Sequence, residues 1–140
     1  MELTIQYLTE KFREYNKLYF DTHLPTPNFK LMKSYRTAGL FSCDKIIGKR
    51  RLKHQCIEIS CYYDWTEEKL RDILVHEMVH YYLAYKHIDN ELSHGEEFIK
   101  MCEDMNKKYG LNLSVIIDMT NVKRNKKAPR LSWFLVHIFG

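Results

Sequence analysis

The segment from Ile73 to Tyr85, ILVHEMVHYYLAY, is apolar on every side of a helix, yet it carries three ionisable groups besides its tyrosines. A helix without a polar face is stable only in the interior of a protein. The ionisable groups are His76, Glu77 and His80, and an unpaired glutamate in such a place costs several kcal/mol to keep charged. The chain must therefore fold around this helix and provide a partner for the buried carboxylate.

The spacing of the two histidines indicates a metal site. At about 100° per residue, His76 and His80 lie within about 40° of each other, one turn apart. Both rings can reach one ion at Zn–N distances of about 2.0–2.1 Å. Glu77, next to them, can act on water at the ion instead of binding the ion. This is the HExxH pattern, which combines two neutral ligands, an open coordination position and a base. The alternative is a pair of core histidines that hydrogen-bond to carbonyl groups.

A third ligand has to come from outside this helix. His87 lies on nearly the same face as His80, but about 10 Å further along the axis if the helix continues, which is too far to share one ion. His94 is the strongest candidate, because it opens the next predicted helix and Gly95 beside it removes side-chain bulk. A glutamate ligand is the alternative. The candidates are Glu91, Glu96 and Glu97.

Periodicity and capping residues predict two further helices and set the limits of the central one. Apolar residues at helical spacing predict a helix over 4–20, which the two prolines of 23–28 end. The central helix is expected over 66–86, with either Asp64 or Thr66 as its N-cap. Each of these helices has a clear start signal.

The third helix is expected to begin at Ser93, whose capping box is completed by Glu96, and to stop at Gly110. Its apolar stripe is expected to pack in the core instead of binding a cofactor. The stripe consists of Phe98, Met101, Cys102, Met105 and Tyr109.

Three short segments have the composition and alternation of strands. They are 29–32, 39–42 and 56–60, and the economical arrangement is a small antiparallel sheet packed on the helices. The fold class is therefore α+β. Two later apolar segments, 113–119 and 131–139, are expected to be packed, as either strand or helix.

Length and composition limit the class of protein. The 140 residues suit one domain, and no apolar run approaches the ~18–20 residues of a membrane-spanning helix. No basic segment leads into an apolar stretch at the N-terminus. The cysteines form no CxxC pair, which disfavours a zinc ribbon or a redox motif. We expect a cytoplasmic protein with reduced thiols and no membrane association. The cysteines are Cys43, Cys56, Cys61 and Cys102.

The net charge of +4 is ordinary, but the bases are concentrated in two segments, 45–53 and 123–130. Neither segment contains an acidic residue, so each can neutralise several phosphates and support binding to DNA without sequence preference. The alternative is that both are solvated loops. The bases are Lys45, Lys49, Arg50, Arg51 and Lys53 in the first segment, and Lys123, Arg124, Lys126, Lys127 and Arg130 in the second.

Several of these motifs together resemble the SprT-like family, which includes the Spartan proteases. The matching elements are HEMVH at 76–80 and HGEEF at 94–98, together with YNKLYFDTHLP, the Ala38–Gly39 pair and IEIS upstream. The resemblance covers roughly residues 5–110 and implies a zinc metallopeptidase-like domain. It also implies the site residues, with Glu77 as general base. The implied zinc ligands are His76, His80 and His94.

The resemblance also implies a substrate class, because active members of the family cleave proteins in contact with DNA. Many relatives carry a four-cysteine zinc ribbon at the C-terminus, whereas residues 111–140 contain no cysteine. We therefore expect a SprT-like domain over 1–110, followed by a basic and apolar extension that packs on the domain or trails from it.

The resulting interpretation is a zincin-like domain that binds one Zn²⁺ per chain and hydrolyses protein or peptide substrates. The strand at 39–42 offers an edge to which an extended substrate can add. One alternative is a nucleic-acid-binding module whose zinc is structural, with a fourth protein ligand. Another is a zinc hydrolase for a non-peptide amide, which requires a deep, enclosed pocket.

Overall fold

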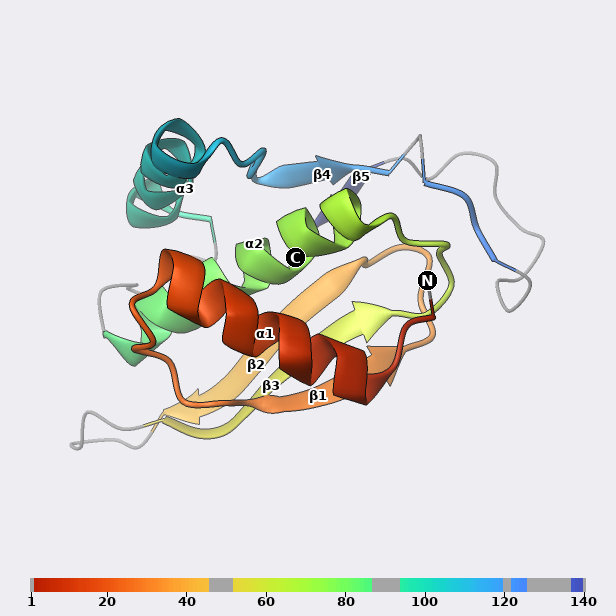
Figure 1. Ribbon diagram of the computed structural model, residues 1–140, viewed down its shortest axis with the longest axis horizontal. Helices are drawn as coiled ribbons and strands as arrows, with labels where there is room; N and C mark the ends of the chain where they lie inside the picture. Colours follow the sequence, from red (N-terminus) through yellow and green to blue (C-terminus); the bar gives the residue numbers. More distant parts are fainter. Residues whose placement is uncertain (1, 46–51, 87–93, 120–121, 126–136, 140) are drawn as a thin grey trace.

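A computed structural model describes the chain over residues 2–45, 52–86, 94–119, 122–125 and 137–139 (Figure 1). Helices and strands are both present, which confirms the α+β class. In chain order the elements are α1 (Ile5–Tyr19), β1 (Asn28–Met32), β2 (Gly39–Lys45), β3 (Leu52–Ser60), α2 (Glu67–Tyr85), α3 (Glu96–Tyr109), β4 (Ile116–Asp118) and β5 (His137–Phe139).

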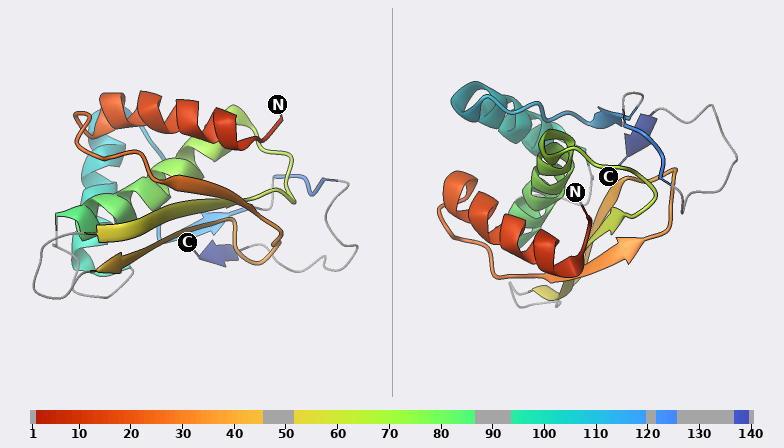
Figure 2. Two further views of the ribbon diagram at one scale, coloured as in Figure 1. Left: turned by 90° about the horizontal axis from the view of Figure 1, so that it is seen from below. Right: turned by 45° about the vertical axis from the view of Figure 1, so that its right-hand side comes forward.

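The helices are arranged around α2. Both α1 and α2 lie on one face of the three-stranded sheet formed by β1, β2 and β3 (Figures 1 and 2). Helix α3 packs against α2, and its last residue, Tyr109, also meets Tyr19 at the end of α1, with 4.9 Å between the ring centroids. The apolar face of the sheet and the inner faces of the helices form one core. Within the described part of the chain, no helix combines the length and the apolarity needed to cross a membrane.

The sheet is mixed, and the expectation of an antiparallel sheet is wrong. The strand order is β1-β3-β2, so the last of these three strands in the sequence, β3, lies at the centre of the sheet. β2 and β3 form an antiparallel hairpin, but β1 runs parallel to β3, with Phe29 opposite Ile57. The chain leaves β1, crosses to the far edge as β2 and returns through β3. Side-chain alternation reports which residues share a face, and it carries no information on strand direction.

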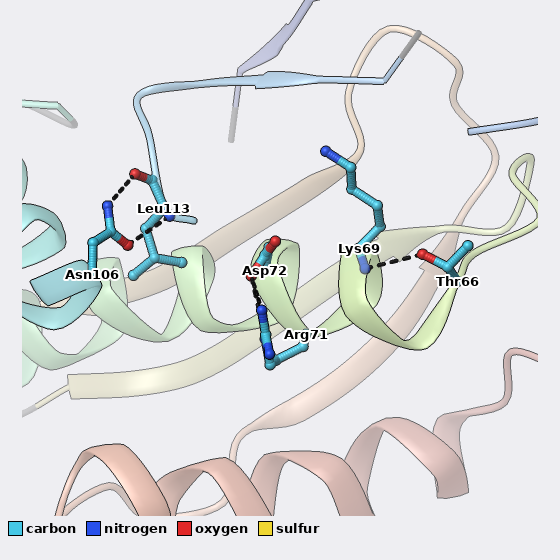
Figure 3. A network of polar contacts seen from close by, with 6 residues as sticks. All are labelled: Thr66, Lys69, Arg71, Asp72, Asn106 and Leu113. Atoms are coloured by element: carbon cyan, nitrogen blue, oxygen red, sulfur yellow. Dashed lines mark hydrogen bonds and ion pairs between the residues drawn. The ribbon is translucent and has the colours of Figure 1, made fainter. Parts of the chain in front are cut away.

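The first two helices begin at threonine caps. The Oγ1 atom of Thr4 accepts a hydrogen bond from the Tyr7 amide at 3.0 Å, and Thr66 accepts one from the Lys69 amide at 3.1 Å (Figure 3). Thr66, and not Asp64, is therefore the N-cap of α2. Every residue of α2 from 72 to 81 is buried, as its uniform apolarity predicts.

The third helix starts later than expected. Its N-cap is Gly95, which has no side chain to accept a hydrogen bond, and Ser93 lies outside the described residues. His94 therefore precedes α3. The helix ends at Gly110, which has the left-handed φ of 69° that favours glycine. The stripe packs as predicted: Phe98, Cys102 and Met105 are buried, and Met101 and Tyr109 pack partly buried against the core.

The side-chain amide of Asn106 holds the chain that follows α3 against that helix. Asn106 donates from Nδ2 to the carbonyl of Leu113 at 2.9 Å and accepts from the Leu113 amide at 2.8 Å (Figure 3). Beyond this point the undecided apolar segments form β4 and β5, an antiparallel pair, although residues 131–136 lie outside the described part. The core includes Leu111, Leu113, Met119 and Val122. The predicted division at residue 110 stays a prediction.

Residues 122–125 connect two loops of the domain. The Asp64 amide donates to the carbonyl of Lys123 at 2.7 Å, and the Asn125 amide donates to the carbonyl of Tyr62 at 2.9 Å. The guanidinium of Arg124 lies over the ring of Tyr35, 5.2 Å from its centroid. This segment therefore joins the chain between β3 and α2 to the loop between β1 and β2.

Candidate metal centre

Helix α2 places two imidazoles and a carboxylate together in the interior. His76 and Glu77 are completely buried, and His80 is 7% exposed. One helical turn separates the two histidines, and their ring centroids are 5.1 Å apart. The Oε2 atom of Glu77 lies 3.9 Å from Nε2 of His76.

His94 completes a histidine triad with His76 and His80. Its Nε2 atom lies 3.2 Å from Nε2 of His80, and its ring centroid lies 5.5 Å from that of His76. One ring nitrogen from each of the three residues lies within 4.8 Å of the others. The three histidines are therefore positioned to bind a metal ion, although His94 comes from a different part of the chain.

The triad matches the geometry of a metal site. Two nitrogens bound tetrahedrally at about 2.0–2.1 Å are about 3.3–3.4 Å apart, and the observed separation between His80 and His94 is 3.2 Å. The same separation permits a hydrogen bond between two neutral rings. Neutral imidazole suits zinc and several other transition metals. Among the residues that the structure describes, no cysteine or carboxylate belongs to this group.

Burial makes Glu77 a poor place for an unpaired charge. Desolvation raises the pKa of its carboxyl group to about 8, and the backbone of Phe41 acts in the opposite direction without overcoming it. Neither oxygen of Glu77 meets the geometry of a hydrogen bond with any described residue. A cation at the histidine triad would stabilise the ionised carboxylate, and the residues present fit such an ion.

Two residues beside the candidate ligands help to shape the site. A Cβ atom on Gly39 would lie 3.0 Å from Oε2 of Glu77 and 3.0 Å from Cγ1 of Ile73, so β2 can approach α2 this closely only with glycine at this position. Phe98 packs against all three histidine rings. The sequence indicated Phe98 as a core residue and as the end of the HGEEF element of the family resemblance, and Ala38–Gly39 as part of that resemblance, without giving either a role in the site.

The other sequence candidates lie away from the triad or outside the described residues. Glu96 and Glu97 are exposed in the first turn of α3 and do not belong to the group of possible ligands. Glu91 and His87 lie outside the described residues, so their places stay predictions. His94 is the candidate that the fold brings to His76 and His80.

Only part of the two basic segments is described. Lys53 and Lys123 are exposed, and Arg124 is half-buried against Tyr35. The remaining side chains lie outside the described residues or are not placed. They are Lys45, Lys49, Arg50, Arg51, Lys126, Lys127 and Arg130. DNA binding therefore stays a prediction.

Fold and site together define an α+β domain in which two histidines of α2 and one just before α3 form a triad at a possible metal site beside a buried glutamate. The sequence model of the SprT-like family matches residues 8–121, and the chain belongs to the SprT-like family. The match includes both the histidine pair of α2 and His94, and it extends beyond α3 through β4. No curated protein matches the chain significantly.

Proposed function

We propose that this protein is a zinc-dependent metallopeptidase with a zincin-like domain. The observation that carries the proposal is the meeting of His76, His80 and His94 beside Glu77, a buried carboxylate outside the ligand group. Membership in the SprT-like family, which is associated with metallopeptidase-like function, supports it.

The number of protein donors favours a catalytic ion over a structural one. Structural zinc sites are closed by four protein ligands, whereas catalytic sites have three and keep one position open. Among the described residues, the group of possible ligands has three members, all histidines. We infer about one zinc per chain. When bound, zinc polarises the scissile carbonyl and lowers the pKa of water.

Glu77 has the position and the environment of a general base. It precedes the second histidine by three residues and follows the first directly, so its carboxylate lies beside the triad without joining it. In this role Glu77 takes a proton from the attacking water and passes it to the leaving amine. Because Gly39 has no side chain, β2 leaves room for the Glu77 carboxylate, which a Cβ atom at position 39 would approach to 3.0 Å.

The β2 strand supports a peptide as the substrate. β2 lies at one edge of the three-stranded sheet and contacts α2, and its residues Gly39 and Phe41 lie next to Glu77. An extended peptide can add to such an edge through backbone hydrogen bonds, which bring its carbonyl groups past the site. Proteins associated with DNA are the proposed substrates, with the basic segments 45–53 and 123–130 as the DNA contacts.

The test combines metal content with hydrolysis of an unfolded protein substrate, with and without DNA. Purified protein should contain about one zinc per chain, and His94→Ala should lose most of it. The exposed His54, which pairs with Asp44, provides the control, and His54→Ala should keep its zinc. Glu77→Gln should keep zinc and lose about 10²-fold or more of the activity. A Glu77→Gln protein that loses its metal would make Glu77 a ligand and overturn its role as base.

A further inference from the structure

The Phe98 side chain makes ring contacts with all three histidines of the triad. Its ring centroid lies 4.9 Å from that of His76, 4.2 Å from that of His80 and 5.0 Å from that of His94. The side chain is 1% exposed. Phe98 therefore packs directly against the triad and leaves almost no room for water around its own ring.

The ring orientations show how this contact acts on each imidazole. Phe98 is stacked on His80, with an angle of 19° between the two planes, and lies edge-on to His76 and His94 at 67° and 71°. Stacked and edge-to-face arrangements are the two that aromatic rings prefer. The stacked ring restricts tilting of the His80 imidazole, and the edge-on contacts restrict the space in which the His76 and His94 rings can turn.

The position of Phe98 in the chain explains why one residue can reach all three rings. It lies in the first turn of α3, four residues after His94, and it faces the two histidines that α2 presents one turn apart. The ring thus fills the space between the two helices at the metal centre. Its size helps to set how closely His94 approaches His76 and His80.

We propose that Phe98 is the positioning residue of this metal centre, which holds the three imidazoles in the arrangement that binds the ion. The inference rests on the proposed metal site and adds to it a residue outside the ligand set. Groups that orient metal ligands typically change metal affinity by 10–100-fold when they are replaced. In this site the orienting group is an aromatic hydrocarbon that acts by shape alone.

The test compares Phe98 with an equally buried phenylalanine elsewhere in the core. Phe12 on α1 is 0% exposed, and its ring contacts Phe29 and Tyr81 at 5.7 and 6.4 Å. Phe98→Leu, Phe98→Met and Phe12→Leu each remove an aromatic ring from the core. Circular dichroism establishes that each variant is folded, and Phe98→Met keeps more side-chain length should Phe98→Leu not fold. Zinc affinity is then measured by competition with a chelator, and the visible absorption of bound Co²⁺ reports ligand geometry.

The expected result is that both Phe98 variants bind zinc about 10–100-fold more weakly and show an altered Co²⁺ spectrum, while Phe12→Leu stays within about twofold of the wild type. Equal affinity in wild type and Phe98 variants would overturn the role of Phe98 and leave the metal site standing. An equal loss in Phe12→Leu would also overturn it, because the effect would then come from general destabilisation. A wild-type protein that binds no zinc would overturn the proposed metal site and the role of Phe98 together.

Discussion

The Oε2 atom of Glu77 would lie 3.0 Å from a Cβ atom on Gly39. A distance of 3.0 Å is shorter than nine in ten contacts of real Cβ atoms, so a larger residue at position 39 must displace the carboxylate, Ile73 or β2 by a few tenths of an ångström. The two residues belong to different layers of the fold, and the contact links the start of the edge strand to the proposed base. This proximity leads to the first prediction.

Gly39→Ala is expected to lower kcat/KM by up to about 10-fold, because the carboxylate must give way by a few tenths of an ångström and a misplacement of about 1 Å costs about 10²-fold. Zinc content should stay unchanged, since the atoms nearest to an added Cβ belong to Glu77 and Ile73 and not to a candidate ligand. Steady-state kinetics and metal analysis on the same sample check both statements.

Gly110→Ala provides the matched control for that variant. Gly110 has a positive φ of 69° and no neighbour within 4 Å of an added Cβ atom, so alanine there strains only the backbone. We expect a loss of about 1 kcal/mol in the free energy of unfolding and unchanged kcat/KM. Full activity in Gly39→Ala would contradict the steric role assigned to Gly39.

The stability of the metal-free protein should depend on pH through Glu77. Burial raises the pKa of this carboxyl from 4.5 to about 8, so the folded state binds a proton that the unfolded state releases over this interval. The free energy of unfolding contributed by Glu77 is therefore full below about pH 4.5 and falls as the pH rises toward about 8. Glu77→Gln has no titratable carboxyl at this position and therefore lacks this pH-dependent contribution to stability.

Chemical denaturation of the metal-free wild type and Glu77→Gln, at intervals from pH 5 to 9, measures the difference between them. We expect Glu77→Gln to gain stability relative to the wild type as the pH rises. A difference that is independent of pH would show that the carboxyl group titrates normally in the folded protein.

The burial of the inner face of α3 can be tested through the thiol of Cys102. Cys102 is 4% exposed, and burial raises its pKa to about 12, so almost no thiolate is present at pH 8. Cys43, on β2, is half-buried. At pH 8 we expect iodoacetamide to label Cys102 at least about 100-fold more slowly than Cys43, because labelling must await opening of the core. Mass spectrometry of peptides from timed samples measures both rates, and labelling in denaturant should remove the difference.

DNA binding should be weak, independent of sequence and strongly dependent on salt. Each lysine or arginine that contacts a phosphate releases counterions, so affinity falls steeply as salt rises. Replacing Lys126, Lys127 and Arg130 by glutamate should reduce both the affinity and its salt dependence, with zinc content unchanged. These substitutions are better than truncation after residue 121, which would also remove the core residue Val122.

Fluorescence anisotropy at about 50 mM salt favours the electrostatic contribution and is the most sensitive condition. The same charge reversal at Lys49, Arg50 and Arg51 tests the first segment separately. No binding of the wild-type protein under these conditions would show that both segments are solvated loops, and the zinc peptidase proposal would be unaffected.

The sequence predicted α2 to within one residue at each end, because its signals are local. Thr66 caps the helix through its own side chain, and the uniform apolarity of the segment requires burial. The need for a third ligand followed from the same segment, and His94 was its strongest candidate, ahead of the glutamates, because it stands with Gly95 at the start of the next predicted helix. These inferences depend on residue type and spacing, which the sequence states directly.

The parts that could not be predicted depend on long-range packing. The parallel pairing of β1 with β3 follows from the path of the chain. The alternation of side chains along a strand does not report that path. Phe98 has the same pattern as any core residue of α3, and only the docking of α3 on α2 gives it contacts with three histidines. The need for glycine at position 39 likewise arises only when β2 packs against α2, a helix that begins 28 residues later, at Glu67.

The order of the strands has a consequence for synthesis of the chain on the ribosome. The sheet has β3 at its centre, so β1 and β2 have no shared partner until residue 60 has been made. The histidine triad needs still more of the chain, because His94 and Phe98 follow α2. A nascent chain can therefore bury α2 only late, and its histidine triad forms after nearly the whole sheet and both flanking helices are available. The proposed hydrolytic site would thus stay incomplete during most of its own translation, when unfolded segments of the same chain are nearest to it.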